Sequence, residues 1–230
     1  VLEADTNKEI KVVTLTHNET STGVTNPVKE LAKIIREHGA VSVVDGITSI
    51  GAIDCKMDEW GIDVLISGSQ KGFMIPPGLA FLVANDRAWE LHKQCKYPGF
   101  YFRWDDYKKN LEKDTTPWTP AVNLFIALDK ALEMMKEEGL DNIFARHKHN
   151  AQLLRKGIKD MGLKLFVEDE TIASWAITSV LPPEGVSVPD IRKTLKEDYN
   201  IVVANGQNDL KDKIFRMGTL GFVSERDVLT

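Results

Sequence analysis

Residues 41–45, VSVVD, constrain the fold of this chain more than any other segment. The run is short, rich in β-branched residues and without a polar face, which is typical of a parallel strand buried on both sides of its sheet. Further strand-like runs stand at 11–16, 63–69 and 78–84. The buried run ends on Asp45, so a carboxylate is expected at the point where this strand stops.

A helix is predicted between the first two of these strands. Asn26 is a good N-cap, Pro27 suits the first helical position, and Gly39 suits the end. The apolar residues between 28 and 35 recur at helical spacing. The order of strand, helix, strand, crossover and strand predicts an α/β fold with a mostly parallel sheet flanked by helices.

The second half of the chain is expected to begin with a long connection. Residues 97–120 are aromatic and polar without clear periodicity, and we interpret them as a functional loop. Two helices are predicted next, at 120–138 and 140–161, and strand-like runs then alternate with helical ones again. This pattern predicts a large domain at 1–139 and a smaller C-terminal α/β domain over the rest of the chain.

Composition narrows the classes of partner and compartment. The net charge is −5, and the 29 basic and 34 acidic residues form no basic stripe, which argues against nucleic acid as the main partner. No apolar run approaches the roughly 20 residues that span a bilayer, and no signal peptide is visible. Cys55 and Cys95 match no metal-binding spacing. A reduced, cytoplasmic protein is therefore expected.

Three polar segments follow predicted strands. Asp45 ends one strand, Lys71 follows another within Ser67–Gly72, and the segment 16–23, THNETSTG, follows a third. Open α/β sheets bind ligands in the crevice at the carboxyl ends of their strands. All three segments are therefore expected to meet at one site.

Asp45 and Lys71 suit the chemistry of pyridoxal 5′-phosphate (PLP). PLP needs a lysine amine with which to form an imine and an acid beside its pyridine nitrogen. Asp45 would keep that nitrogen protonated through a charge-assisted hydrogen bond, and Lys71, once released, would act as the base that moves the α-proton.

A simpler interpretation competes with this one. From spacing alone, a turn-capping Asp45 and a solvated Lys71 are favoured, because both residue types are common after strands. The composition of the loops changes the balance. Gly, Ser and Gln surround Lys71, and Pro76-Pro77-Gly78 follows, which indicates a rigid, closely packed turn.

Four motifs together carry a resemblance to a known family. They are THNETSTG, VVDGITSIG, SGSQKGFMIPPG and FRMGTLG, in this order along the chain. The chain resembles the class V aminotransferases of PLP fold type I, and within them the alanine–glyoxylate and serine–pyruvate aminotransferases. The resemblance covers essentially the whole sequence. It implies transfer of an amino group between a small amino acid, alanine or serine, and glyoxylate or pyruvate.

The resemblance assigns roles to individual residues. Lys71 matches the lysine that holds PLP as a Schiff base, and Asp45 matches the partner of the pyridine nitrogen. Ile47 matches the apolar residue on one face of the ring. Thr20 matches the hydroxyl residue that bonds the phenolic oxygen, and Gln70 matches a ligand of the phosphate.

Two further roles follow from the resemblance. Arg216 matches the arginine that binds the α-carboxylate of the substrate, for which a planar guanidinium is suited; without the resemblance, a surface salt bridge would be the simpler interpretation. The segment 115–120 resembles one that reaches the neighbouring subunit's phosphate, which implies a homodimer. The choice between Thr116 and Thr119 stays open, with Thr119 favoured, and a purely structural turn before Pro120 is an alternative.

Members of the family carry more chain than is present here. An N-terminal part with a phosphate-binding loop and a ring-stacking aromatic residue has no counterpart, and the extreme C-terminus is also lacking. Both domains are therefore expected to be incomplete, and a truncated, non-catalytic subunit of the same fold remains a rival. Phosphonate- and phosphoserine-type aminotransferases are a second alternative.

Other residues are assigned no chemistry. Cysteine desulfurases place His before the lysine and use a cysteine of the second domain. Here Gln70 precedes Lys71 and neither cysteine lies in that domain, which argues against desulfuration.

His147 and His149 are two apart on a predicted helix and so face different ways, which argues against a shared metal ion. We interpret them as part of a solvated helix surface.

Overall fold

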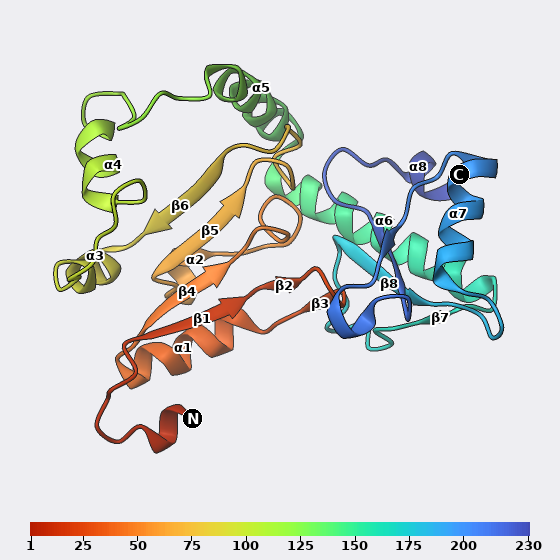
Figure 1. The fold of residues 1–230 in the computed structure, drawn as a ribbon, viewed down its shortest axis with the longest axis horizontal. Coiled ribbons are helices and arrows are strands. Elements are labelled where there is room, and N and C mark those ends of the chain that lie inside the picture. Colours follow the sequence, from red (N-terminus) through yellow and green to blue (C-terminus); the bar gives the residue numbers. More distant parts are fainter.

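The computed structural model describes all of residues 1–230 and contains two four-stranded sheets side by side (Figure 1). The first sheet has the order β1-β4-β5-β6, with β1 at Val12–Thr16, β4 at Val41–Asp45, β5 at Val64–Gly68 and β6 at Ala80–Ala84. The pairs β1–β4 and β4–β5 are parallel, and β6 runs antiparallel to β5. The predicted mostly parallel sheet is confirmed.

Helix α1 (Val28–His38) covers one face of this sheet, as Figure 1 shows. Its buried residues Val28 and Ala32 pack with Val44 of β4 and with Ile62, which precedes β5. The helix starts one residue later than predicted and Asn26 does not cap it. The Asn26 side chain instead donates to the carbonyl of Thr16, at the end of β1, at 2.8 Å. The short α2 (Met57–Trp60) follows β4.

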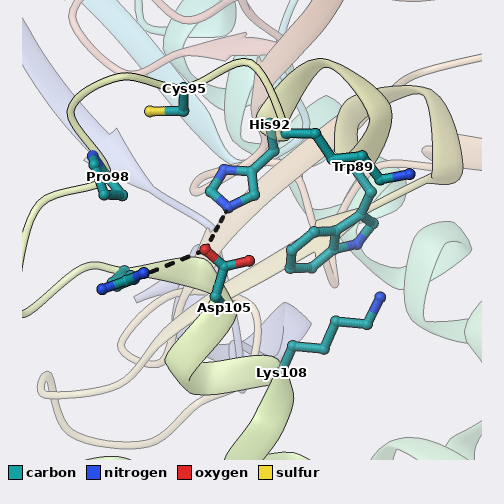
Figure 2. A pocket seen from close by; sticks show the side chains of 8 residues that line it. Trp89, His92, Cys95, Pro98, Asp105 and Lys108 are labelled. Carbon is teal, nitrogen blue, oxygen red and sulfur yellow. Dashed lines mark hydrogen bonds and ion pairs between the residues drawn. The ribbon is translucent and has the colours of Figure 1, made fainter.

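The interpretation of 97–120 as a loop throughout is wrong, since α4 (Trp104–Leu111) lies within it. The helix packs against α3 (Asp86–His92), with the Trp104 ring 5.5 Å from that of Trp89 and 5.4 Å from that of His92. Figure 2 shows these two helices facing each other across a cavity. The aromatic residues around the helix obscure its short helical periodicity in the sequence. Contact with α3 stabilises the helix.

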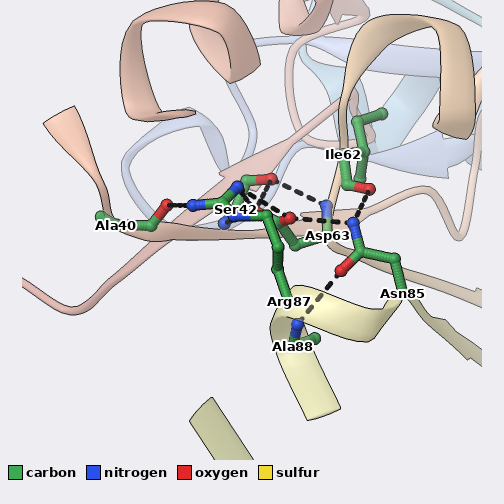
Figure 3. Close-up of polar contacts among 7 residues, drawn as sticks. All are labelled: Ala40, Ser42, Ile62, Asp63, Asn85, Arg87 and Ala88. Atoms are coloured by element: carbon green, nitrogen blue, oxygen red, sulfur yellow. Dashed lines mark hydrogen bonds and ion pairs between the residues drawn. The ribbon is translucent and has the colours of Figure 1, made fainter. Parts of the chain in front are cut away.

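A buried carboxylate ties α3 to the sheet at the end opposite the carboxyl ends of β4 and β5 (Figure 3). Asp63 accepts from the Arg87 guanidinium at 3.0 Å, from the Asn85 amide at 2.9 Å and from the Ser42 backbone at 2.9 Å. Arg87 also donates to the Ala40 carbonyl at 3.0 Å. Both oxygens of the buried carboxylate are hydrogen-bonded, which fixes the start of β5 relative to β4.

The second half contains two long helices and the second sheet. Helices α5 (Val122–Glu138) and α6 (Leu140–Asp160) are separated by Gly139, which has a φ of 81°. The bounds of both helices are close to those predicted. The sheet has the order β7-β8-β10-β9 with antiparallel pairs. Its strands and remaining helices are β7 (Lys164–Leu165), β8 (Ile177–Leu181), α7 (Val188–Tyr199), β9 (Ala204–Asn205), β10 (Phe215–Gly218) and α8 (Glu225–Leu229).

One hairpin lies between the two sheets in Figure 1. It is formed by β2 (Asn18–Glu19) and β3 (Val24–Thr25), directly after β1. Its backbone bonds the second half of the chain, with Thr25 donating to the Ile172 carbonyl at 2.7 Å and Ser174 donating to the Gly23 carbonyl at 2.9 Å. The hairpin therefore links the first sheet, which it follows in the sequence, to the second half of the chain.

Candidate functional site

The turn after β4 holds Asp45 and Ile47 at the carboxyl end of the first sheet. Asp45 is level with Thr16 of β1 and Ile66 of β5 in the strand register. Its carboxylate accepts from the Ile47 backbone at 2.9 Å, an arrangement that fixes the side chain within the turn. The Gly46 amide donates to the Ile66 carbonyl at 2.8 Å, so the turn begins as a continuation of the sheet.

The turn after β5 holds Lys71 and is locked by a serine. The Ser69 hydroxyl donates to the Pro76 carbonyl at 2.8 Å and accepts from the Leu79 backbone at 3.2 Å. Lys71 itself is half-buried, and its carbonyl accepts from the Met74 backbone at 2.9 Å. The turn around Lys71 is closely packed, as expected.

Glycines bring these two turns into direct contact. A Cβ at Gly72 would lie 2.1 Å from the Ile50 carbonyl oxygen, and one at Gly51 would lie 3.0 Å from the Gly72 Cα. A Cβ at Gly68 would meet Gln70 Oε1 at 3.3 Å and Ile47 Cγ2 at 3.9 Å. Only glycine permits so close an approach of two backbones. Ile47 and Gln70 therefore both lie close to the bare backbone of Gly68 at the end of β5.

The third segment brings a hydroxyl to this site. Thr20 Oγ1 lies 3.1 Å from Thr48 Oγ1. The Thr48 hydroxyl donates to the backbone carbonyl of Asn18 at 2.8 Å and accepts from the side-chain amide of Asn18 at 3.0 Å. Thr48 thus orients Thr20 and links the segment 16–23 to the turn after β4. Its role was missed because nothing in the sequence distinguishes it from other turn threonines.

Arg216 of β10 reaches the same place from the second sheet. Its Nη1 donates to the Thr20 carbonyl at 2.7 Å and its Nε donates to the Asn205 carbonyl at 2.8 Å, while Nη2 makes no hydrogen bond. The residue is 8% exposed. Burial lowers the pKa of the guanidinium, and the nearby Glu19 carboxylate opposes that shift. One edge of a desolvated guanidinium is therefore available to an anion.

The residues present fit PLP. The donor set combines an amine, a carboxylate, a hydroxyl, an amide and a guanidinium, on turns that contact one another. Ile47 supplies an apolar surface beside the bare Gly68, where a flat ring needs one.

Two predicted residues are not joined to this group by hydrogen bonds. Thr116 Oγ1 donates to the Trp118 carbonyl at 2.5 Å within its own segment, and Thr119 is exposed. Trp118 stacks on Tyr101 with ring centroids 5.5 Å apart, and Phe100 lies 5.0 Å from Trp118. Trp118 and these two exposed aromatics form a cluster on the surface of the chain.

The cavity in Figure 2 is a separate feature, with a volume of about 420 Å³. It lies between α3 and α4, and none of the predicted site residues lines it. Its Asp105 carboxylate lies 3.1 Å from His92 and 3.8 Å from Arg103, and its Lys93 lies 2.6 Å from Glu90. Because most of its charges are already paired, it offers little to a charged ligand.

Two histidines, His17 and His147, are buried. His17 is buried beside Trp60, with ring centroids 5.8 Å apart, and burial lowers its pKa to about 4. His147 is 1% exposed, so its interpretation as a solvated residue is wrong, whereas His149 is exposed. His147 is buried because the segment 219–223 lies over it, a contact between distant parts of the sequence.

Comparison with known proteins adds a family relationship. A family model described as aminotransferase class-V matches residues 1–218. The chain is 49% identical over 230 residues to the soluble hydrogenase 42 kDa subunit of Anabaena cylindrica, covering 100% of this chain and 60% of that protein. It is 38% identical over 229 residues to the serine–glyoxylate aminotransferase of Hyphomicrobium methylovorum, covering 98% and 56%.

Solved structures show the same likeness. The ureidoglycine–glyoxylate aminotransferase of Bacillus subtilis superposes with a TM-score of 0.92 at 31% identity, over 99% of this chain and 60% of that one. The pyridoxamine–pyruvate aminotransferase of Mesorhizobium loti superposes with a TM-score of 0.94 at 28% identity, over 99% of this chain and 59% of that one.

The chain spans about 60% of the length of the curated relatives it matches first. None of its helices combines the length and apolar character required to cross a bilayer.

Proposed function

The chain belongs to the class V aminotransferases, and from this premise we propose that the complete protein is a PLP-dependent aminotransferase with Lys71 as its catalytic lysine. The observation that carries the proposal is the convergence of four segments on one site. The turns holding Asp45 and Lys71 touch through Gly51 and Gly72, and Arg216 bonds the segment that holds Thr20.

PLP, when bound, supplies an electron-withdrawing ring that stabilises the carbanion left when an amino acid loses its α-proton. Asp45 would hold the pyridine nitrogen protonated by accepting its hydrogen, since its carboxylate is fixed by the Ile47 amide. Ile47 would cover one ring face, and Gln70 would donate to the phosphate. Thr20, oriented by Thr48, would bond the phenolic oxygen.

Lys71 and Arg216 would act on the substrate. Arg216 would bind the α-carboxylate through the edge that includes Nη2, which the protein leaves unbonded. The Lys71 amine would remove the proton from the α-carbon of the amino donor and, in the second half of the exchange, would deliver a proton to the α-carbon of the 2-oxo acid. The buried guanidinium and the glycine-locked turn would hold Arg216 and the Lys71 backbone in place, which would lower the entropic cost of aligning an amino acid.

The substrates we propose are a small amino acid, alanine or serine, and a 2-oxo acid, glyoxylate or pyruvate. Relatives named serine–glyoxylate aminotransferase, at 36–38% identity, support this pair. A phosphoserine aminotransferase of Cytophaga hutchinsonii superposes with a TM-score of 0.84 at 26% identity, which supports the alternative of a phosphonate- or phosphoserine-type enzyme.

We also propose a homodimer in which Thr119, or Thr116, reaches the neighbour's phosphate, and a division into a large domain at 1–139 and a small one at 140–230. The exposed aromatics around Trp118 support the dimer. The two separate sheets and the break at Gly139 support the division. A cytoplasmic location is part of the same proposal.

The names of two relatives suggest a second candidate function, that of a non-catalytic subunit. Proteins named as soluble hydrogenase subunits, from Anabaena cylindrica and Synechococcus sp. (strain PCC 6716), are 49% and 48% identical to this chain. A non-catalytic subunit of this fold would need neither the amine of Lys71 nor the free guanidinium edge of Arg216. Retention of both supports the enzyme.

One experiment separates the two. The complete protein is incubated with PLP, reduced with borohydride and mapped by peptide mass spectrometry. We expect the cofactor's mass on Lys71, and a visible absorbance that shifts when alanine or serine is added before reduction. Cofactor mass on another lysine would remove Lys71 from its proposed role, and none at all would support the subunit.

A further inference from the structure

The helix α6 binds the segment 219–223, which follows Arg216 along the chain. Arg146 donates to the Gly221 carbonyl at 2.8 Å, and Asn150 donates to the Val223 carbonyl at 2.7 Å. Arg146 is itself held by Glu138, at 2.6 Å. Three polar side chains of one helix face, counting His147 between them, thus hold a stretch of backbone that has no regular structure.

The two hydrogen bonds of the His147 ring are compatible with only one protonation state of that ring. The Gly221 amide donates to Nε2 at 3.0 Å, and Nδ1 lies 2.7 Å from the Ile143 carbonyl. An amide can only donate and a carbonyl can only accept, so the ring is neutral and carries its proton on Nδ1. Burial lowers the pKa of His147, which maintains this neutral form.

The other side of Gly221 faces the turn of Lys71. A Cβ at Gly221 would lie 3.6 Å from the Lys71 carbonyl oxygen and 3.5 Å from Met74 Cγ. Gly221 has a φ of 91°, a backbone conformation suited to glycine. The segment is also tied to the second sheet, since Thr219 donates from its backbone to the Ala176 carbonyl at 2.9 Å. Gly221 is therefore packed between His147 and the backbone of the catalytic lysine.

We infer that His147 is a positioning residue, which fixes Gly221 against the Lys71 turn and so sets the position of Lys71 relative to Arg216. His147 acts through this backbone contact and touches neither reacting group. The inference rests on the proposed function for its kinetic consequence, but its structural part stands independently.

Two amide variants of the complete protein test the inference. In His147→Gln the side-chain oxygen reaches the position of Nε2 and still accepts from Gly221. In His147→Asn the side-chain nitrogen replaces Nδ1 and keeps the bond to Ile143, but nothing reaches Gly221. His149→Gln is the control, since His149 is exposed on α6 and its side chain hydrogen-bonds Glu225, at 3.2 Å.

The first measurement is amide hydrogen exchange without cofactor. In His147→Asn we expect the amides of 221–223 and of Met74 and Ile75 to exchange about tenfold faster, because a buried N–H loses its acceptor. His147→Gln and His149→Gln should match the wild type. Equal exchange in the Asn and Gln variants would overturn the inference.

The second measurement is amino transfer by the PLP-loaded protein. We expect kcat to fall about tenfold in His147→Asn and less than threefold in His147→Gln, with KM for the amino acid nearly unchanged. Faster exchange with an unchanged kcat would show that His147 has only a structural role, and would overturn the inference. If the wild type transfers no amino group, the proposed function fails, and the exchange data alone decide whether His147 fixes Gly221.

Discussion

The strand-end turns, residues 46–53 and 69–79, and the aromatic segment, residues 97–120, are held in different ways. The turns are fixed from inside, by Ser69 and by glycines whose backbones touch. The aromatic segment instead exposes its largest side chains, with Tyr97 at 91% and Phe100 at 78%. The packing of the turns is thus accounted for within the chain, whereas the aromatic segment leaves large apolar side chains exposed.

The largest effect is expected at Lys71. Lys71→Ala should lower the rate of amino transfer by at least about 10²–10⁴-fold, the usual contribution of a positioned acid or base, even when PLP still binds. The half-reaction with alanine or serine, followed by cofactor absorbance in the complete protein, measures it. Lys113→Ala is the matched control, because Lys113 is an exposed lysine of the aromatic segment. Activity retained by the Lys71 variant would remove the strand-end turns from the site.

Gly72 measures how tightly the two turns are packed. Gly72→Ala places a Cβ 2.1 Å from the Ile50 carbonyl oxygen, and such overpacking should lower the free energy of unfolding by about 3 kcal/mol or more. Gly157 of α6 has no atom within 4 Å of its virtual Cβ, so Gly157→Ala should raise that free energy by roughly 0.5–1 kcal/mol. Urea denaturation of both variants gives the difference, and similar midpoints would contradict the close contact.

Arg216 tests whether the second sheet contributes to the same site. Arg216→Lys loses the two-point contact with a carboxylate, worth about 1.5–3 kcal/mol, so amino-acid binding should weaken about tenfold to hundredfold with cofactor absorbance intact. Arg192→Lys is the control, since Arg192 donates to the Val203 carbonyl at 3.0 Å in the same half of the chain. Equal amino-acid affinities in the two variants would place Arg216 outside the site.

The smallest effect on folding is expected in the aromatic segment. Phe100→Ser combined with Phe102→Ser removes two exposed rings, so the free energy of unfolding at fixed low concentration should change by less than about 0.5 kcal/mol. Sedimentation should nevertheless show weaker self-association, because exposed aromatic patches commonly mark interfaces. A dimer of unchanged stability would mean that this segment faces something other than a second copy.

The sequence predicted most of the fold because its signals are local. The run VSVVD became β4 with the expected bounds, and the break at Gly139 separates α5 from α6. Helix α4 was missed because its stability depends on Trp89 and His92 of another helix.

The site was predicted in the same uneven way. The strand-end position of Asp45 and the turn around Lys71 follow from local patterns, while the roles themselves came from family resemblance. Thr48 and His147 could not be predicted, since each acts through a partner at least 30 residues away. The burial of His147 depends on Gly221, 74 positions further along the chain.

The hairpin β2–β3 has a mechanical consequence. It is bonded to the second half of the chain at Gly23 and Thr25, and Arg216 bonds it again at Thr20. A rigid-body rotation of the second sheet would therefore carry Thr20 along with Arg216, while Asp45 and Lys71 stayed with the first sheet. It would also have to break the hydrogen bonds of Thr48 to Thr20 and Asn18. Such a motion would turn about the base of the hairpin, where Asn26 bonds both Thr16 and His17. Opening and closing of the site would thus separate one pair of functional groups from the other and leave each pair intact.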